Sequence, residues 1–248
     1  MLDDLPKPVV FAHRGASQYA PENTIAAFEL AVSQGADAIE LDVKLSADGK
    51  AVVIHDQTVD RTTDGSGRVN QMTLASLKGL NAQYRFDAYA GEQIPTLDEV
   101  FESVGKRIFI NVELTNYASR HDNLVPIVAE IVKRHQLEKE VLFSSFIPGN
   151  LKKMKILLPD VPVALLASQG LLGVASRSAL FIQLSPKIIH PYLDDVTPQL
   201  MNTERRRGRR VHVWTVNEDN DLRRMIDYGV DGFFTDDPAK ALRILERK

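Results

Sequence analysis

The chain has 248 residues, 44% of them hydrophobic, and its 30 basic and 33 acidic side chains leave a formal charge of −3. This length suits one large core, as in an α/β barrel, better than two small ones. The balanced charge gives no electrostatic reason to expect nucleic acid or an anionic membrane as a partner. The absence of cysteine excludes disulfides, a thiolate nucleophile and zinc–thiolate sites. We therefore expect a single domain, residues 1–248, that acts on a small molecule.

The amino terminus does not resemble a signal peptide, because residues 1–6 are acidic and no apolar run follows a basic start. No stretch approaches the roughly 20 uncharged apolar residues that a membrane span needs. The basic run at 205–210 lies between an expected helix and an expected strand, and we interpret it as a solvated helix end. These features predict a cytoplasmic protein without stable membrane insertion, and they leave the oligomeric state open.

Short apolar segments alternate with helical patterns along the chain. Strands are expected near 9–13, 38–43, 107–114, 141–146, 161–167, 181–185, 210–216 and 232–235. Helices are expected near 25–35, 97–104, 124–131, 149–158, 198–207, 219–228 and 238–247, with a weaker one near 172–178. Eight such alternations favour a TIM (β/α)8 barrel, in which functional residues lie at the carboxyl ends of the strands. Residues 57–96 lack this periodicity and are expected to form a small insertion over the barrel mouth, after a hairpin of the second strand.

The hairpin prediction rests on Asp48-Gly49, a strong turn signal between extended segments. A two-residue loop there pairs positions whose numbers add to 97, so that Asp42 faces His55. Glu40, Asp42 and His55 then share one face, and a slip of one residue would destroy this convergence. Asp56 would point away and is interpreted as structural.

Three acidic side chains are candidate metal ligands. Glu40 and Asp42 end the second strand, and Glu113 lies on the next one, where alternation turns it into the barrel with Asn111 and Thr115. A buried carboxylate needs a partner, and a shared cation would supply one. An oxygen-only site suits Mg²⁺ or Ca²⁺ better than zinc. The alternative is that these acids form salt bridges with arginine or lysine.

Two of the six histidines are candidate catalysts. His13 and His55 each close an apolar strand beside the acidic residues, and an ordinary histidine pKa near 6.5 lets one act as a base and the other as an acid at neutral pH. The other four are interpreted as packed or surface residues: His121, His135, His190 and His212. Together, these histidines and acids indicate metal-assisted acid–base chemistry on a phosphate ester.

The order of several motifs resembles the glycerophosphodiester phosphodiesterase family over nearly the whole chain. The motifs are His13-Arg14-Gly15, Pro21-Glu22-Asn23-Thr24, Glu40-Leu41-Asp42-Val43, Asp48-Gly49 to His55-Asp56, Asp60-Arg61-Thr62-Thr63, Ile94-Pro95-Thr96-Leu97, Asn111-Val112-Glu113-Leu114, Val213-Trp214-Thr215-Val216-Asn217 and Phe234-Thr235-Asp236-Asp237-Pro238. The resemblance implies a phospholipase-C-like barrel that cleaves glycerophosphodiesters to glycerol 3-phosphate and an alcohol.

The resemblance also implies roles for particular residues. His13 and His55 would be the catalytic pair, with His13 as base and His55 as acid. One divalent cation, Mg²⁺ or Ca²⁺, would bind Glu40, Asp42 and Glu113. The phosphate would contact Arg14, the 57–96 insertion would shape the glycerol pocket, and Trp214 would line the site.

Several roles have alternatives. Arg14 matches phosphate geometry but would also anchor a neighbouring acid. Glu22 is a candidate for substrate binding or for the dipole of the first helix, and Trp214 for a substrate platform or barrel filling. Thr115 departs from the family, which usually has a lysine two residues after the third metal ligand.

Two other functions fit the same residues. A lysophospholipase D would need an apolar groove in the insertion, which Tyr84, Phe86 and Tyr89 would line. A phosphodiester-binding module without turnover would be consistent with Thr115, because the missing lysine would leave the phosphoryl charge to the metal and Arg14.

Overall fold

The computed structural model describes residues 2–170, 173, 182–185 and 187–247. The strands are β1 (Val9–His13), β2 (Ala38–Leu45), β3 (Ala51–Val53), β4 (Phe109–Leu114), β5 (Val141–Ser145), β6 (Val163–Ala167), β7 (Ile188–Pro191), β8 (Arg210–Val213) and β9 (Gly232–Thr235). The α-helices are α1 (Ile25–Ser33), α2 (Leu74–Lys78), α3 (Leu97–Val104), α4 (Leu124–His135), α5 (Pro148–Leu157), α8 (Pro198–Arg206), α9 (Asp219–Tyr228) and α10 (Pro238–Ile244). Short 3-10 helices lie at η1 (Leu2–Asp4), η2 (Val69–Gln71), η3 (Asp87–Tyr89) and η4 (Leu193–Asp195).

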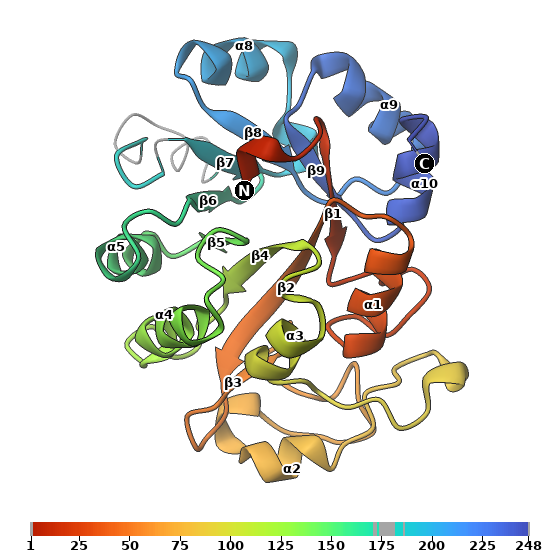
Figure 1. Ribbon diagram of the computed structural model, residues 1–248, viewed down its shortest axis with the longest axis vertical. Helices are drawn as coiled ribbons and strands as arrows, with labels where there is room; N and C mark the ends of the chain where they lie inside the picture. The colour runs from red at the N-terminus through yellow and green to blue at the C-terminus, as the bar shows by residue number, and fades with distance from the viewer. Residues whose placement is uncertain (1, 171–172, 174–181, 186, 248) are drawn as a thin grey trace.

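The described strands close into a parallel barrel. Their order is β1, β2, β4, β5, β6, β7, β8 and β9, and β9 pairs with β1 to complete the ring. The short strand β3 lies outside the ring and pairs antiparallel with the end of β2. Figure 1 shows α1, α3, α4, α5, α8, α9 and α10 outside the ring of strands. The expected TIM (β/α)8 barrel is confirmed.

Local sequence signals set the helix ends. Thr96 and Glu99 form a capping box at α3, in which each side chain bonds the other residue's backbone N–H. Pro198 and Pro238 occupy the first positions of α8 and α10, where a backbone N–H has no helical partner to lose. Gly229 ends α9 with φ +68°, a left-handed conformation that favours glycine.

The core has an inner and an outer part. Apolar side chains fill the barrel interior, among them Phe11, Phe109, Leu142 and Phe234. Leu2 closes the amino end of this interior. Larger apolar clusters pack the helices onto the outside of the strands. Of the helices in the described ranges, none is both long and apolar enough to cross a bilayer.

The strand expected at 181–185 is wrong. Residue 182 is helical, residues 183 and 184 form a turn, and the strand at this place in the barrel is β7 at Ile188–Pro191. The sequence has two neighbouring apolar runs here, and pairing with β6 and β8 selects the second, which contains two β-branched residues. The weaker helix expected near 172–178 lies outside the described residues except for Gly173.

Residues 57–96 have a small core of their own. Val59, Val69, Leu77 and Ile94 pack with Val52 of β3 and neighbouring apolar residues. Figure 1 shows this segment, coloured orange to yellow, beside β3 and α3 at the lower end of the view.

The basic run at 205–210 is only partly a solvated helix end. Arg209 is buried, and its guanidinium pairs with the buried carboxylate of Glu204 at 3.0 Å. Arg210 donates to the Leu2 carbonyl at 3.1 Å. Part of this run therefore ties α8 and the amino-terminal segment to the barrel.

Candidate active site

Three carboxylates meet at the carboxyl ends of neighbouring strands. Parallel pairing of β2 with β4 places Asp42 beside Glu113 and Glu40 beside Asn111. Oxygen atoms of Glu40, Asp42 and Glu113 all lie within 4.8 Å of one another. Glu40 and Asp42 are 3% and 1% exposed, and the Tyr117 hydroxyl donates to Glu113 at 2.6 Å. The sequence-predicted acids are therefore brought together by the barrel.

This acidic cluster is short of positive charge. Burial and the negative charge of Asp42 raise the pKa of Glu113 to about 8, and burial with the charges of Asp42 and Glu113 raises that of Glu40 well above its usual range. Burial also opposes the charge of Asp42, but Arg14, His55 and Lys44 outweigh it and lower its pKa. A divalent cation would relieve this repulsion, and the oxygen-only donor set suits a hard ion such as Mg²⁺ or Ca²⁺. The residues present therefore fit a metal.

The salt-bridge alternative applies to only one of the three acids. The Arg14 Nε lies 3.4 Å from Asp42. Glu40 accepts a hydrogen bond from the Arg14 backbone N–H at 3.0 Å, and Glu113 accepts from a tyrosine hydroxyl. Within the described part of the chain, neither Glu40 nor Glu113 forms an ion pair with a lysine or arginine side chain.

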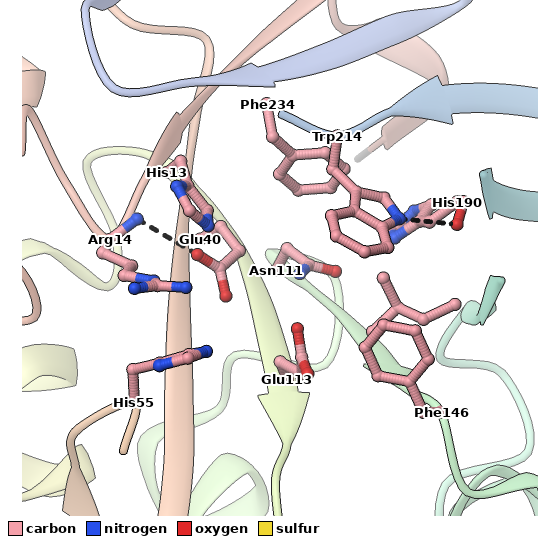
Figure 2. Close-up of a pocket in the computed structure, with 11 residues that line it drawn as sticks. His13, Arg14, Glu40, His55, Asn111, Glu113, Phe146, His190, Trp214 and Phe234 are labelled. Carbon is pink, nitrogen blue, oxygen red and sulfur yellow. Dashed lines mark hydrogen bonds between the residues drawn. The ribbon is translucent and has the colours of Figure 1, made fainter. Parts of the chain in front are cut away.

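Each candidate histidine is held by its own carboxylate. The His13 Nδ1 lies 2.7 Å from Asp236, and the His55 Nδ1 lies 2.6 Å from Asp56. Both histidines line one pocket with Glu40 and Glu113, as Figure 2 shows. A carboxylate accepts the Nδ1–H and leaves Nε2 as the nitrogen available to a substrate. The site thus has two oriented imidazoles beside the acidic cluster.

Asp56 therefore does more than the sequence indicated. It orients His55, and the Arg61 Nε donates to its second carboxylate oxygen at 2.7 Å. Arg61 also binds Glu22 through both terminal nitrogens, at 2.6 and 2.8 Å. Arg61 thus ties the insertion to both edges of the site.

The predicted register of the β2–β3 hairpin is wrong by one residue. Val43 pairs with Val53 and Lys44 with Val52, so paired numbers add to 96 and not 97. The loop is longer than expected, because the Ser46 N–H bonds the Lys50 carbonyl and Gly49 has φ +74°. A turn followed by a left-handed glycine is the usual form of a three-residue hairpin loop. Asp42 therefore does not face His55 across the ladder.

His55 reaches the acidic cluster by another route. Strand β3 ends at Val53, and the chain then bends around the buried amine of Lys44. The Lys44 Nζ donates to the carbonyls of Ile54 at 2.8 Å and Asp56 at 2.9 Å, and also to the carbonyl of His55. Burial lowers the pKa of Lys44 to about 8. The bend that Lys44 holds, and not strand pairing, places His55 in the site.

Arg14 lies between the acids and the pocket. The Arg14 Nη1 donates to Glu22 at 2.9 Å. Burial of the guanidinium lowers its pKa, but the negative charges of Asp42, Glu22 and Glu40 outweigh this effect and raise the pKa above its usual value. Gly15 follows with φ +84°, and a Cβ there would lie 2.6 Å from the Ala27 backbone, so only glycine fits this turn. Arg14 is thereby held at the end of β1 as a fixed positive charge lining the pocket.

The other predicted residues have clear positions. Glu22 precedes α1, whose first turn is capped by the Thr24 hydroxyl, so Glu22 pairs with arginines and does not cap the helix. Trp214 is partly buried and lines the pocket, and its indole N–H donates to the His190 carbonyl at 2.9 Å. Thr115 is buried, and its hydroxyl donates a hydrogen bond to the Val43 carbonyl at 2.9 Å. Thr115 does not line the pocket.

Sequence reasoning missed the contacts of Asp56 and Asp236 with the two histidines. It correctly expected His190 to be a packed residue, but it missed that His190 lines the pocket. Asp236 follows β9 directly, and β9 pairs with β1 so that Ala12 lies opposite Thr235. Barrel closure therefore predicts that Asp236 and His13 are neighbours, a signal that was present in the sequence. His190 is in the strand that was placed at the wrong residues, so its position could not be inferred.

A parallel barrel with catalytic-type side chains in a pocket at its carboxyl end defines the class: a TIM-barrel enzyme. The family model described as "Glycerophosphoryl diester phosphodiesterase family" matches residues 13–240. The chain belongs to that family and is an enzyme of that kind.

Individual relatives agree. The chain is 39% identical over 243 residues to a glycerophosphodiester phosphodiesterase of Caldanaerobacter subterraneus subsp. tengcongensis, covering 97% of this chain and 99% of the relative. It is 37% identical to one of Bacillus altitudinis, covering 96% and 98%. A solved Oleispira antarctica phosphodiesterase in complex with the product sn-glycerol-3-phosphate is 31% identical, with a TM-score of 0.88 and 98% of each chain covered.

Proposed function

We propose that this enzyme hydrolyses glycerophosphodiesters to sn-glycerol 3-phosphate and an alcohol, with His13 and His55 as its acid–base pair. The observation that carries the proposal is the pair of carboxylate-oriented imidazoles beside one acidic cluster in one pocket. The product bound to the Oleispira antarctica phosphodiesterase supports the substrate class.

The proposed reaction needs one proton removed and one supplied. His13, with its Nδ1–H on Asp236, accepts the proton of the attacking hydroxyl at Nε2 as the new P–O bond forms. His55, protonated and held by Asp56, gives its Nε2 proton to the leaving alcohol as the old P–O bond breaks. The attacking hydroxyl belongs to water, which gives glycerol 3-phosphate directly, or to the substrate's own 2-position, which gives a cyclic phosphate. In the second case a water molecule then adds to phosphorus and the bond from phosphorus to the 2-oxygen breaks, which gives glycerol 3-phosphate.

Glu40, Asp42 and Glu113 would hold one divalent cation, Mg²⁺ or Ca²⁺. Such a cation, when bound, offsets charge on the phosphoryl oxygens and lowers the pKa of a neighbouring hydroxyl. Arg14 supplies a second, fixed positive charge toward the phosphate.

We also propose that the whole chain is one catalytic domain and that the 57–96 insertion borders its mouth. Tyr84 and Arg85 of the insertion line a recess of about 170 Å³ with His13 and Glu22. An apolar groove for a lysophospholipid finds little support there. Phe86 packs edge-on against Tyr89, and Arg61 and Arg85 lie 5.8 and 5.5 Å from the Tyr84 ring centre. A water-soluble diester fits this mouth better than a lipid.

The test is release of glycerol 3-phosphate from glycerophosphocholine and glycerophosphoethanolamine with Mg²⁺, Ca²⁺ or a chelator. We expect metal-dependent release that falls by about 10² to 10⁴ in His13→Ala and in His55→Ala. His135→Ala is the matched control, because His135 bonds Asp98 outside the pocket lining. Binding of the diester without cleavage would instead indicate a binding module, and faster cleavage of a long-chain lysophospholipid would indicate a lysophospholipase D.

A further inference from the structure

Two residues at the inner end of the pocket each have a buried polar atom without a hydrogen-bond partner among the described residues. The Asn111 Oδ1 and the His190 Nδ1 are buried, form no hydrogen bond with any described residue, and belong to residues that are 1% and 0% exposed. Both residues line the same pocket of about 100 Å³ as the acidic cluster. Leaving a buried polar atom without a partner destabilises a protein, so two such atoms on residues that line one cavity indicate a ligand that supplies their hydrogen bonds.

The two residues are held from behind. The Asn111 Nδ2 donates to the Ser144 hydroxyl at 3.0 Å, which fixes the plane of the amide. The His190 Nε2 lies 3.2 Å from the His212 Nδ1. Burial lowers the pKa of both histidines, to about 3 for His212, so both rings are neutral near pH 7.

Neutral rings leave two ways to share the protons. If His190 donates to His212, then the buried His212 Nε2, which has no partner in the described part of the chain, must carry an N–H. If His212 donates to His190, the His212 Nε2 is only an unpaired acceptor, which is the less costly defect. The second arrangement leaves the His190 Nδ1–H as a donor for the pocket. The inner end then offers one donor and, at the Asn111 Oδ1, one acceptor.

The surroundings of these atoms are apolar. Phe146, Leu166, Trp214 and Phe234 complete this end of the pocket. Figure 2 shows Phe146, Trp214 and Phe234 on the side of Asn111 opposite His13 and Arg14. A small group with a carbon face and hydroxyls suits such walls, because the carbons pack on the rings while the hydroxyls bond the two polar atoms.

We propose that His190 and Asn111 recognise the hydroxyls of the substrate's glycerol group, with His212 as the positioning residue for His190. The proposal rests on the proposed function, since the phosphoryl group must lie at the acidic cluster for the glycerol to extend inward. The alternative occupant is a choline group against the aromatic rings. Choline methyls would leave both the Asn111 Oδ1 and the His190 Nδ1 without partners.

The test measures binding of three monoesters by titration calorimetry with Mg²⁺ or Ca²⁺ present: sn-glycerol 3-phosphate, n-propyl phosphate and phosphocholine. Propyl phosphate has the same charge and carbon number as glycerol 3-phosphate but lacks both hydroxyls. We expect the wild-type enzyme to bind glycerol 3-phosphate at least about tenfold more tightly than propyl phosphate. His190→Phe and Asn111→Leu should each reduce this ratio severalfold and leave propyl phosphate binding within about twofold. His212→Phe should reduce the ratio less.

His135→Phe is the matched control, because it makes the same change at a histidine outside the pocket lining. A wild-type ratio near one overturns the proposal without the need for any variant. The proposal is also overturned if a folded His190→Phe protein binds glycerol 3-phosphate and propyl phosphate with equally reduced affinity, or if the wild-type enzyme binds phosphocholine more tightly than glycerol 3-phosphate. Because binding is measured apart from turnover, failure to cleave any diester would refute the proposed function alone.

Discussion

Replacing Asp236 by asparagine tests how His13 is activated. In the structure Asp236 receives hydrogen bonds on both oxygens, from the His13 Nδ1 at 2.7 Å and from the Asn217 Nδ2 at 2.6 Å. Asparagine has only one side-chain oxygen. If that oxygen serves Asn217, the new NH2 group faces His13 and favours the tautomer with the proton on Nε2, which cannot act as a base.

The magnitude follows from the electrostatics of Asp236. Burial alone would raise its pKa, but His13, Asn217 and Ser17 lower it from 3.8 to about 2. That fall corresponds to about 2 kcal/mol at about 1.36 kcal/mol per pKa unit, and the part due to His13 would also stabilise the imidazolium that the proposed mechanism forms. A loss of up to about 2 kcal/mol is about 30-fold in rate, and the wrong tautomer would lower the rate further. We therefore expect kcat of Asp236→Asn to fall by about 10² to 10⁴.

The assay is release of glycerol 3-phosphate from glycerophosphocholine, with kcat and KM determined separately. Asp237→Asn is the matched control, because Asp237 bonds the Tyr19 hydroxyl and caps α10 without contacting His13. Asp237→Asn should lower thermal stability and leave kcat within about threefold. The reasoning is refuted if Asp236→Asn keeps more than half of the wild-type kcat, or if both variants lose activity equally.

Two further predictions concern stability. The pKa of His212 is about 3 in the folded protein, against 6.5 for an ordinary histidine, so the unfolded chain binds more protons between these values and stability falls as the pH drops through this range. Between pH 6.5 and 4.5 the free energy of unfolding should fall by about 2 kcal/mol because of His212 alone. In urea unfolding experiments, the stability of His212→Phe should therefore fall by about 2 kcal/mol less than that of the wild-type protein over this range. An equal fall in both proteins would contradict the prediction. Lys44→Met removes three hydrogen bonds to the backbone at 54–56 and should lower the free energy of unfolding by about 2–4 kcal/mol. Its kcat should fall at least about tenfold as His55 loses its place, and an unchanged kcat would show that the bend is held by other contacts.

The barrel and the acidic cluster were predictable because each follows from a periodic or positional rule. Strands that alternate with helices are compatible with only a few folds. Acids at the carboxyl ends of neighbouring parallel strands lie at the same end of the barrel and therefore come close together. That Asp42 and Glu113 are neighbours follows from the order of the strands and from the alternation of side chains along each strand.

The predictions that were wrong concern the hairpin register and the position of one strand, which depend on tertiary contacts. The hairpin loop is one residue longer than predicted, because Gly49 adopts a left-handed conformation, and the register of the strands is shifted accordingly. His55 still reaches the acids because Lys44 holds a bend in the chain. No local rule links a lysine at position 44 to three carbonyls beyond the hairpin. The choice of 188–191 over 181–185 as a strand likewise depended on which run its neighbours could pair with.

Closure of the barrel between β1 and β9 has a consequence for biosynthesis. His13 leaves the ribosome more than 200 residues before Asp236, the carboxylate that orients it. A nascent chain that extends through β4 already carries Glu40, Asp42 and Glu113, so it has all the acids of the metal-type cluster while His13 still has no orienting partner. The acids of the cluster are thus synthesised well before the His13–Asp236 pair can exist, and that pair forms only when β9 docks against β1.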